Sequence, residues 1–262
     1  MLKKFSYIFS LLFASILSSC LDTEEKIVVH ADNSGTYSMT MDLGGIFKMA
    51  SSLGDDKASP DRIKEKRDTT IYLKDLMNAT DSLTAHEKIL YKEAFIKVKM
   101  DEGKEEMKIV MSTPFKNMTD LTEIKNNFYA VMNKLKVFEE AAGGKAKSNE
   151  QGENFGMGAK TANPIGDQFT FLSSPGNISY TITNIDAFKK MVATDSSLSM
   201  MAQMTSIMGD FNYRTVIILP KAVKGYDGPG STISTDKKTI TFFTTLTEML
   251  EHPEKVSYKL KY

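Results

Sequence analysis

The residues of this chain that could bind a metal are concentrated in one methionine-rich stretch. Met201, Met204 and Met208 recur at spacings of three and four residues, which places them on one face if this stretch is helical. Soft thioethers select Cu(I), so a copper site is one hypothesis. Methionine also fills irregular cores and lines adaptable apolar grooves, so simple packing and a binding groove for a lipid or peptide stay open as alternatives.

No catalytic constellation accompanies these methionines. His30, His86 and His252 lie in different predicted elements and lack the spacing of a metal site. The sequence has no Gly-x-Ser-x-Gly nucleophile elbow. Gly152 to Gly158 matches a phosphate-binding loop only weakly, because no strand precedes it and no Gly-Lys-Ser/Thr follows. We therefore predict a protein that is not an enzyme and that has no cofactor.

The only cysteine of the chain, Cys20, ends a segment with the features of an export signal. Lys3 and Lys4 precede an apolar run from Phe5 to Leu17, which is too short to cross a bilayer as a helix. The segment Leu17-Ser18-Ser19-Cys20 resembles the lipobox of bacterial lipoproteins. A thiol that has no second cysteine in the chain also cannot form an intramolecular disulfide.

The lipobox resemblance implies that a signal peptidase removes residues 1–19 and that Cys20 is acylated, with palmitate or a similar chain. Two or three acyl chains, at about 0.8 kcal/mol per buried methylene, anchor a protein stably to a membrane. The alternative is an ordinary signal peptide that is cleaved near Ser18 and leaves a free thiol.

An acidic stretch from Leu21 to Glu25 follows the cysteine directly. It resembles the surface-export signal of lipoproteins from Bacteroidetes-type bacteria, and a solvated linker is the alternative interpretation. We predict that residues 20–25 form the acylated cysteine and its tether, and that the protein is lipid-anchored in the outer membrane of the cell envelope. The periplasmic face and the cell surface both remain open.

The composition describes a near-neutral body with enough apolar material for a core. The full chain has 33 basic and 33 acidic residues in 262, and 41% of its residues are hydrophobic. Removal of residues 1–19 takes away two lysines and leaves 31 basic against 33 acidic residues, a formal charge of −2. Nucleic-acid binding depends on concentrated Lys and Arg, so we expect no nucleic-acid partner.

The pattern of strands and helices predicts an α+β fold. Alternating runs around turn signals predict hairpins, and apolar residues at spacings of three and four predict a helix after each one. We therefore expect a largely antiparallel sheet that is built from repeated hairpin-then-helix units, with helices packed on the sheet. The three units comprise hairpins at 27–41, 95–111 and 168–182, followed by helices at 46–53, 120–138 and 185–208.

The chain also divides into two parts. We predict a first α+β part over residues 26–140 and a second over residues 167–262, which could form one domain together. Residues 141–166 are rich in Gly and polar residues, which is typical of a flexible linker or loop. Residues 54–68 are almost wholly polar and predict a solvated excursion.

Two stretches resemble uncharacterised envelope lipoproteins of Bacteroidetes and, more distantly, the LppM-type lipoprotein domain. They are Lys26 to Asp42, with its Asn33-Ser34-Gly35 turn, and Arg214 to Pro220 followed by Lys238 to Phe242. The resemblance implies a protein that contacts other envelope components and supplies no catalytic residue. We expect a binding or assembly role in the envelope, with an apolar ligand such as a lipid or peptide, or an envelope protein, as partner.

Overall fold

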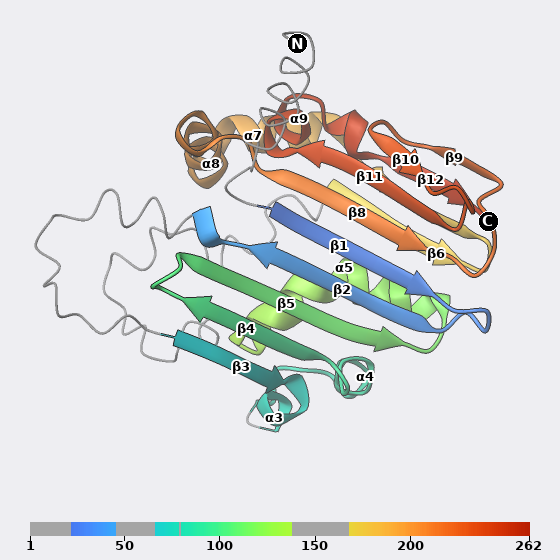
Figure 1. Cartoon of the computed structure of the whole chain (residues 1–262), viewed down its shortest axis with the longest axis horizontal. Helices are drawn as coiled ribbons and strands as arrows, with labels where there is room; N and C mark the ends of the chain where they lie inside the picture. Colours follow the sequence, from blue (N-terminus) through green and yellow to red (C-terminus); the bar gives the residue numbers. More distant parts are fainter. Residues whose placement is uncertain (1–21, 46–65, 79, 138–167) are drawn as a thin grey trace, which may run out of the picture.

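The protein forms two β-sheets with helices packed around them, as Figure 1 shows. The computed structural model describes residues 22–45, 66–78, 80–137 and 168–262. The larger sheet has eight strands. Their spatial order is β10 (Ser231–Ile233), β11 (Thr239–Thr245), β8 (Asn212–Ile218), β1 (Asp22–Val29), β2 (Gly35–Asp42), β5 (Glu106–Phe115), β4 (Phe95–Asp101) and β3 (Lys66–Tyr72).

The smaller sheet has four strands and includes the last strand of the chain. In spatial order these are β6 (Phe169–Ser174), β7 (Asn177–Ile182), β12 (Tyr258–Lys261) and β9 (Gly225–Asp227). The described helices are α3 (Leu73–Met77), α4 (Ala85–Leu90), α5 (Met118–Lys134), α7 (Ile185–Thr194), α8 (Ser196–Met208), α9 (Leu246–Glu251) and the 3-10 helix η3 (Pro253–Val256). Within the described residues, no helix is both long and apolar enough to cross a membrane.

Nearly all strand pairs are antiparallel, and β1 with β8 is the exception. Asp22 pairs with Asn212 and Val28 with Ile218, so these two strands run side by side in the same direction. The predicted α+β class with a largely antiparallel sheet is confirmed. The pairing also places strands from residues 26–140 and from residues 167–262 in one sheet.

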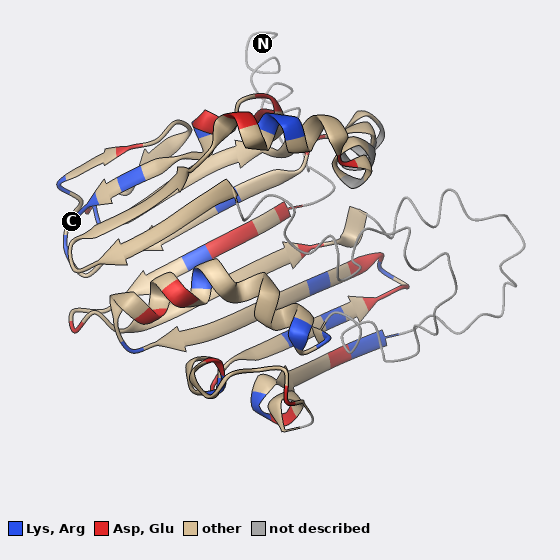
Figure 2. Ribbon diagram, turned by 180° about the vertical axis from the view of Figure 1, so that it is seen from behind, with Lys and Arg blue, Asp and Glu red and all other residues tan. Residues whose placement is uncertain are grey.

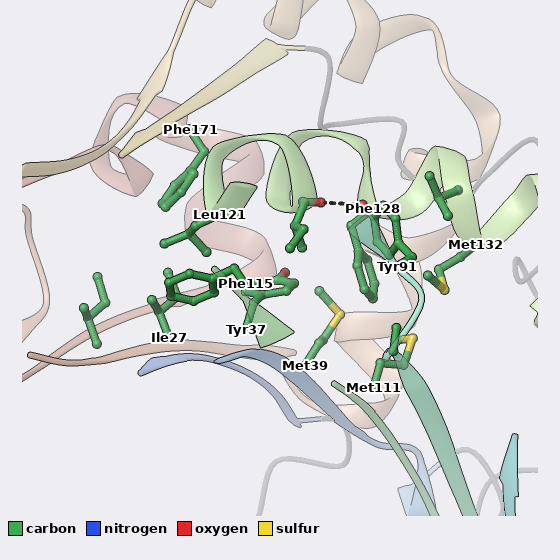
Figure 3. Packing of buried hydrophobic residues seen from close by; sticks show 14 of the residues in the cluster. Ile27, Tyr37, Met39, Tyr91, Met111, Phe115, Leu121, Phe128, Met132 and Phe171 are labelled. Carbon is green, nitrogen blue, oxygen red and sulfur yellow. Dashed lines mark hydrogen bonds between the residues drawn. The ribbon is translucent and has the colours of Figure 1, made fainter. Parts of the chain in front are cut away.

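One face of the large sheet is covered by α5, which Figure 2 shows lying across the strands. Side chains alternate along the strands, so that Ile27, Tyr37 and Met111 are buried on the covered face. Helix α5 presents Leu121 and Phe128 to them, and Figure 3 shows this packing between the helix and the strands. The helix predicted at 120–138 is present, although it ends at Lys134, and Leu121, Ile124, Phe128 and Val131 are buried at the expected spacings of three and four.

Two local features show how individual side chains fix a helix start and a turn. Thr84 and Glu87 form a capping box, in which each side chain bonds the other's backbone amide at the start of α4. At the first hairpin Asn33 has a φ of 66°, and a Cβ on Gly35 would lie 1.8 Å from the carbonyl oxygen of Val28. Only glycine fits at the second of these positions, because any side chain would collide with the paired strand.

Two expectations from the sequence need correction, and a third is not confirmed. Asp22 to Glu25 belong to β1 and are paired on both sides, so they are not a free tether. Residues 66–68 belong to β3, because an edge strand with one unpaired side tolerates polar residues. Repeated hairpin-then-helix units are not confirmed: the third predicted hairpin is the β6–β7 pair of the smaller sheet, and the first helix, at residues 46–53, lies outside the described residues.

Several other predictions cannot be compared with the structure. Cys20, most of the predicted excursion at residues 54–68 and the predicted linker at residues 141–166 lie outside the described residues. The division into two parts therefore stays a prediction.

We predict that the contact between α5 and the sheet is a main source of stability. Phe128 is 1% exposed and packs edge-on against Tyr37, with ring centroids 5.5 Å apart. Phe128→Ala should lower the free energy of unfolding by about 3–5 kcal/mol, because it leaves a cavity between two layers. Urea denaturation followed by circular dichroism measures this. As a control, Leu172→Ala, at a side chain that is 56% exposed, should change the value by less than about 0.5 kcal/mol; similar losses for both variants would contradict the prediction.

Candidate functional site

The three histidines of the chain lie in separate parts of the fold. His30 lies in the β1–β2 turn, His86 on α4 beside Glu123, and His252 after α9. Within the described part of the chain there is no group of three or more His, Cys, Asp or Glu side chains that could bind a metal ion. The three histidines therefore form no common site.

The methionine stretch is helical, as the spacing predicted. Met201, Met204 and Met208 all lie on α8. Their side chains lie outside what the structure describes. A copper site and an apolar groove at these residues therefore remain predictions.

The most unusual group of side chains in the interior was not predicted. Glu25 on β1 and Lys125 on α5 form an ion pair between the helix and the large sheet. Their side chains are only 20% and 7% exposed, respectively. Charged side chains are seldom buried to this extent unless each has a partner of opposite charge.

The positions of Glu25 on β1 and Lys125 on α5 direct both side chains toward the interior. Glu25 shares a face of β1 with Ile27 and Val29, which are buried, so its carboxylate is directed inward. Lys125 is next to Ile124 and lies four residues after Leu121, both buried on the inner side of α5. The sequence contains this signal, but the interpretation of Glu25 as part of a tether concealed it.

Aromatic rings from both sheets surround the ammonium group of Lys125. Its Nζ lies 5.7 Å from the ring centroid of Tyr37, 5.4 Å from that of Phe171 and 4.9 Å from that of Tyr180. A cation within about 6 Å of a ring face is attracted by the ring's quadrupole, and the attraction is larger where water is excluded. Lys125 therefore binds the large sheet and the small sheet to the same helix.

Two buried tyrosine hydroxyls in this cluster differ in whether they have a hydrogen-bond partner. Tyr37 Oη donates a hydrogen bond of 2.9 Å to the Glu25 carboxylate. Tyr258 Oη is buried and has no hydrogen-bond partner within the described residues. Burial, and then the negative charge of Glu25, raise the pKa of Tyr37, Tyr180 and Tyr258 above the usual tyrosine value, so all three are neutral at physiological pH.

The edge of the small sheet is closed by side chains of the same helix. The Asn126 side chain accepts from the Phe171 amide at 3.1 Å and donates to the Phe171 carbonyl at 2.9 Å. One helical turn earlier, Thr122 Oγ1 accepts from the Ser173 amide at 2.9 Å. Thr122 and Asn126 thus satisfy backbone groups of β6 that another strand would otherwise bond.

The arrangement is suited to rigidity and not to chemistry on a substrate. Glu25 and Lys125 neutralise each other, and the tyrosines around them hold their protons. The cluster joins β1, α5 and the small sheet at one point, which fixes their mutual orientation. A buried charged cluster of this kind can specify one packing arrangement even where it adds little net stability.

Comparison with protein-family models, with curated proteins and with solved structures finds no match to this chain. Its class is therefore described by the fold alone: an α+β protein with two mainly antiparallel sheets joined through a helix. The sequence resemblances remain predictions.

We predict strongly non-additive stability effects for the buried ion pair. Lys125→Met should lower the free energy of unfolding by about 3–5 kcal/mol, because the buried Glu25 carboxylate loses its counter-charge. The double variant Glu25→Gln/Lys125→Met should lose less than Lys125→Met alone, which a denaturation double-mutant cycle measures. The exposed pair Arg214–Glu24, at 3.5 Å, is the control, and Arg214→Met should cost less than about 1 kcal/mol. Additive losses from the two single variants would contradict the prediction.

Removal of the Tyr37 hydroxyl and removal of the Tyr258 hydroxyl should have different effects on the free energy of unfolding. Tyr37→Phe should lower the free energy of unfolding by about 1.5–3 kcal/mol, because a hydrogen bond to a charged group is lost. Tyr258→Phe should be neutral or stabilising, because it removes a buried polar atom that has no partner among the described residues. Both are measured by urea denaturation of otherwise identical chains. A larger loss for Tyr258→Phe than for Tyr37→Phe would contradict the assignment of partners.

Proposed function

We propose that the protein is an outer-membrane lipoprotein that is anchored through Cys20 and works by binding a partner in the cell envelope. The observation that carries the anchor is the sequence from Lys3 to Cys20, with its basic start, apolar run and lipobox-like end.

The choice of a protein partner rests on the two faces of the large sheet. The inner face is filled by side chains of α5 and the small sheet. Figure 1 shows the opposite face without a described helix over it. A sheet face with both apolar and polar side chains is a suitable contact surface for another protein. The partly or fully exposed residues that it presents include Val28, Thr36, Ser38, Ser112, Val216, Ile218, Thr241 and Phe243.

This geometry favours contact with a partner over carriage of an apolar ligand. Thr36 pairs with Val28, which in turn pairs with Ile218, so these side chains form a row across three adjacent strands. Side chains in such a row project from the same face of the sheet and form one continuous surface. A continuous surface provides area for another protein, whereas a carried lipid requires a concave site.

We predict that acylation depends on Cys20 alone. In a bacterial expression host supplied with a labelled fatty-acid analogue, the full chain should become labelled and should sediment with membranes. Cys20→Ala should abolish both, since the chain has no other cysteine. Ser19→Ala keeps a small residue before the cysteine and should retain both, which makes it the matched control. Labelling of the Cys20→Ala variant, or an unlabelled and freely soluble unaltered chain, would refute the anchor.

A further inference from the structure

The strands at the edges of the two sheets differ in how well their open sides are protected. Strand β6 bonds Thr122 and Asn126 of α5 along its outer side. Strands β9 and β10 have only three residues each. Strand β3 has seven residues, and no other described strand lies on its outer side, so that it forms the lower edge of the large sheet in Figure 1. A long strand with an open side is a template for pairing with another chain.

The backbone hydrogen bonds identify the residues of β3 that face its open side. Directly after β3, the Leu73 amide donates to the Ala94 carbonyl, just before β4, at 3.0 Å. In an antiparallel pair, residues that bond the neighbouring strand alternate with residues that point away from it. Every second residue back from Leu73 therefore bonds β4. The residues between them direct their backbone amides to the open side, and these are Lys66, Asp68, Thr70 and Tyr72.

The open side of β3 lacks most of the features that prevent strands from pairing. The strand contains no proline, no residue with a positive φ and no bulge, because each residue pairs with one residue of β4. Its charges are confined to the first three positions. Two of them already have partners within the chain, since Lys66 lies 3.2 Å from Asp101 and Asp68 lies 3.3 Å from Lys97. The remaining residues, 69–72, are Thr, Thr, Ile and Tyr, which favour strands.

We propose that β3 pairs with β3 of a second copy of the chain, in antiparallel orientation about a two-fold axis at Thr69. Self-complementary contacts of this kind are the commonest in homo-oligomers. The charged first half of each strand then lies opposite the uncharged second half of the other. A second copy therefore satisfies the open backbone groups without bringing like charges directly opposite each other.

The charges and the start of α3 select this register over its neighbours. With the axis at Thr69, Asp68 of each copy lies opposite Thr70 of the other, and each such pair exchanges two backbone hydrogen bonds. Lys66 lies opposite Tyr72 at both ends of the pairing. An axis at Asp68 would place two carboxylates opposite each other, which is destabilising. An axis at Thr70 would leave the first two residues of β3 unpaired, because α3 begins directly after the strand.

The pairing would join the two large sheets into one sheet of sixteen strands, eight from each copy. Residues that lie opposite each other in a ladder project to the same face, so the outer faces of both copies would lie on one side. A partner with two or more binding sites would then bind with avidity. The pairing requires neither the lipid on Cys20 nor a partner in the envelope, so its failure would leave the proposed function standing.

The two-fold axis permits a test with a single cysteine. The Cys20→Ala chain has no cysteine, so that Thr69→Cys introduces one thiol per copy, opposite its equivalent. The Cα atoms of such a pair lie about 4.5 Å apart, which a disulfide can span. The matched control is Thr232→Cys, which is also exposed and lies on β10 at the other edge of the same sheet.

Both chains are purified whole in a mild non-ionic detergent, oxidised gently and separated by non-reducing electrophoresis. Thr69→Cys should give at least about ten times more disulfide-linked dimer than Thr232→Cys, because pairing holds its thiols at a high effective concentration. The Thr70 amide faces the open side, so Thr70→Pro removes a bond to the second copy and none to β4. Added to Thr69→Cys, it should abolish the crosslink and leave the far-ultraviolet circular dichroism unchanged.

Strong crosslinking of Thr69→Cys that is lost with Thr70→Pro supports the pairing. Equal crosslinking of Thr69→Cys and Thr232→Cys overturns it, as does a crosslink that persists with Thr70→Pro. Stronger crosslinking of Asp68→Cys than of Thr69→Cys also overturns it, because the axis would then lie at Asp68. This comparison decides alone if Thr70→Pro does not fold. Oxidation in intact cells that links Thr69→Cys to a different protein and not to itself would show another occupant on this edge and overturn the second copy.

Discussion

The ion pair between Glu25 and Lys125 is the constraint on which the layered structure depends. It lies where β1, α5 and the small sheet meet, and the cation is within 6 Å of three aromatic rings. A buried charge tolerates few alternative positions, because it has to keep its partner of opposite charge. We infer that the pair helps to specify how the layers are placed, while the apolar core provides most of the favourable free energy.

Hydrogen bonds from polar side chains of α5 also hold the two sheets together. Asn126 and Thr122 bond the backbone of β6, so α5 takes the place of a neighbouring strand at that edge. On the other side of the joint, Phe242 of the large sheet stacks on Tyr258 of the small one, with ring centroids 4.3 Å apart. The small sheet is thereby fixed along an edge and across a face, which leaves little freedom for rotation between the sheets.

Local features of the fold were predictable from the sequence, and long-range ones were not. The spacing of Leu121, Ile124 and Phe128 predicted α5 and its inner side, and alternation predicted the β4–β5 hairpin, because these signals lie within one element. The pairing of β1 with β8 has no such signal, since the residues involved are separated by 190 positions. Strand β3 was missed because its Lys66, Arg67 and Asp68 have the composition of a loop, which an edge strand permits.

The candidate site was predictable only in part, because its residues are far apart in the sequence. The α8 helix followed from methionine spacing, but the Glu25–Lys125 cluster requires knowledge that residues 100 positions apart meet. Glu25 could have been assigned to the interior from its alternation with Ile27 and Val29, had the strand been recognised from Asp22 onward. Acidic composition favoured the opposite interpretation, because short charged segments are more often solvated.

The central position of β1 has a consequence for the order in which the chain can fold. Ribosomes deliver residues from the N-terminus, so β1 emerges first among the described strands, and β2 can join it early. Its other neighbour, β8, begins at Asn212, after most of the chain has been delivered. Until then one side of β1 has unpaired amides and carbonyls, and closing a loop of this length is entropically slow. Among the described strands, the one nearest the N-terminus is therefore completed late, and until then its open edge can pair with other copies of the chain.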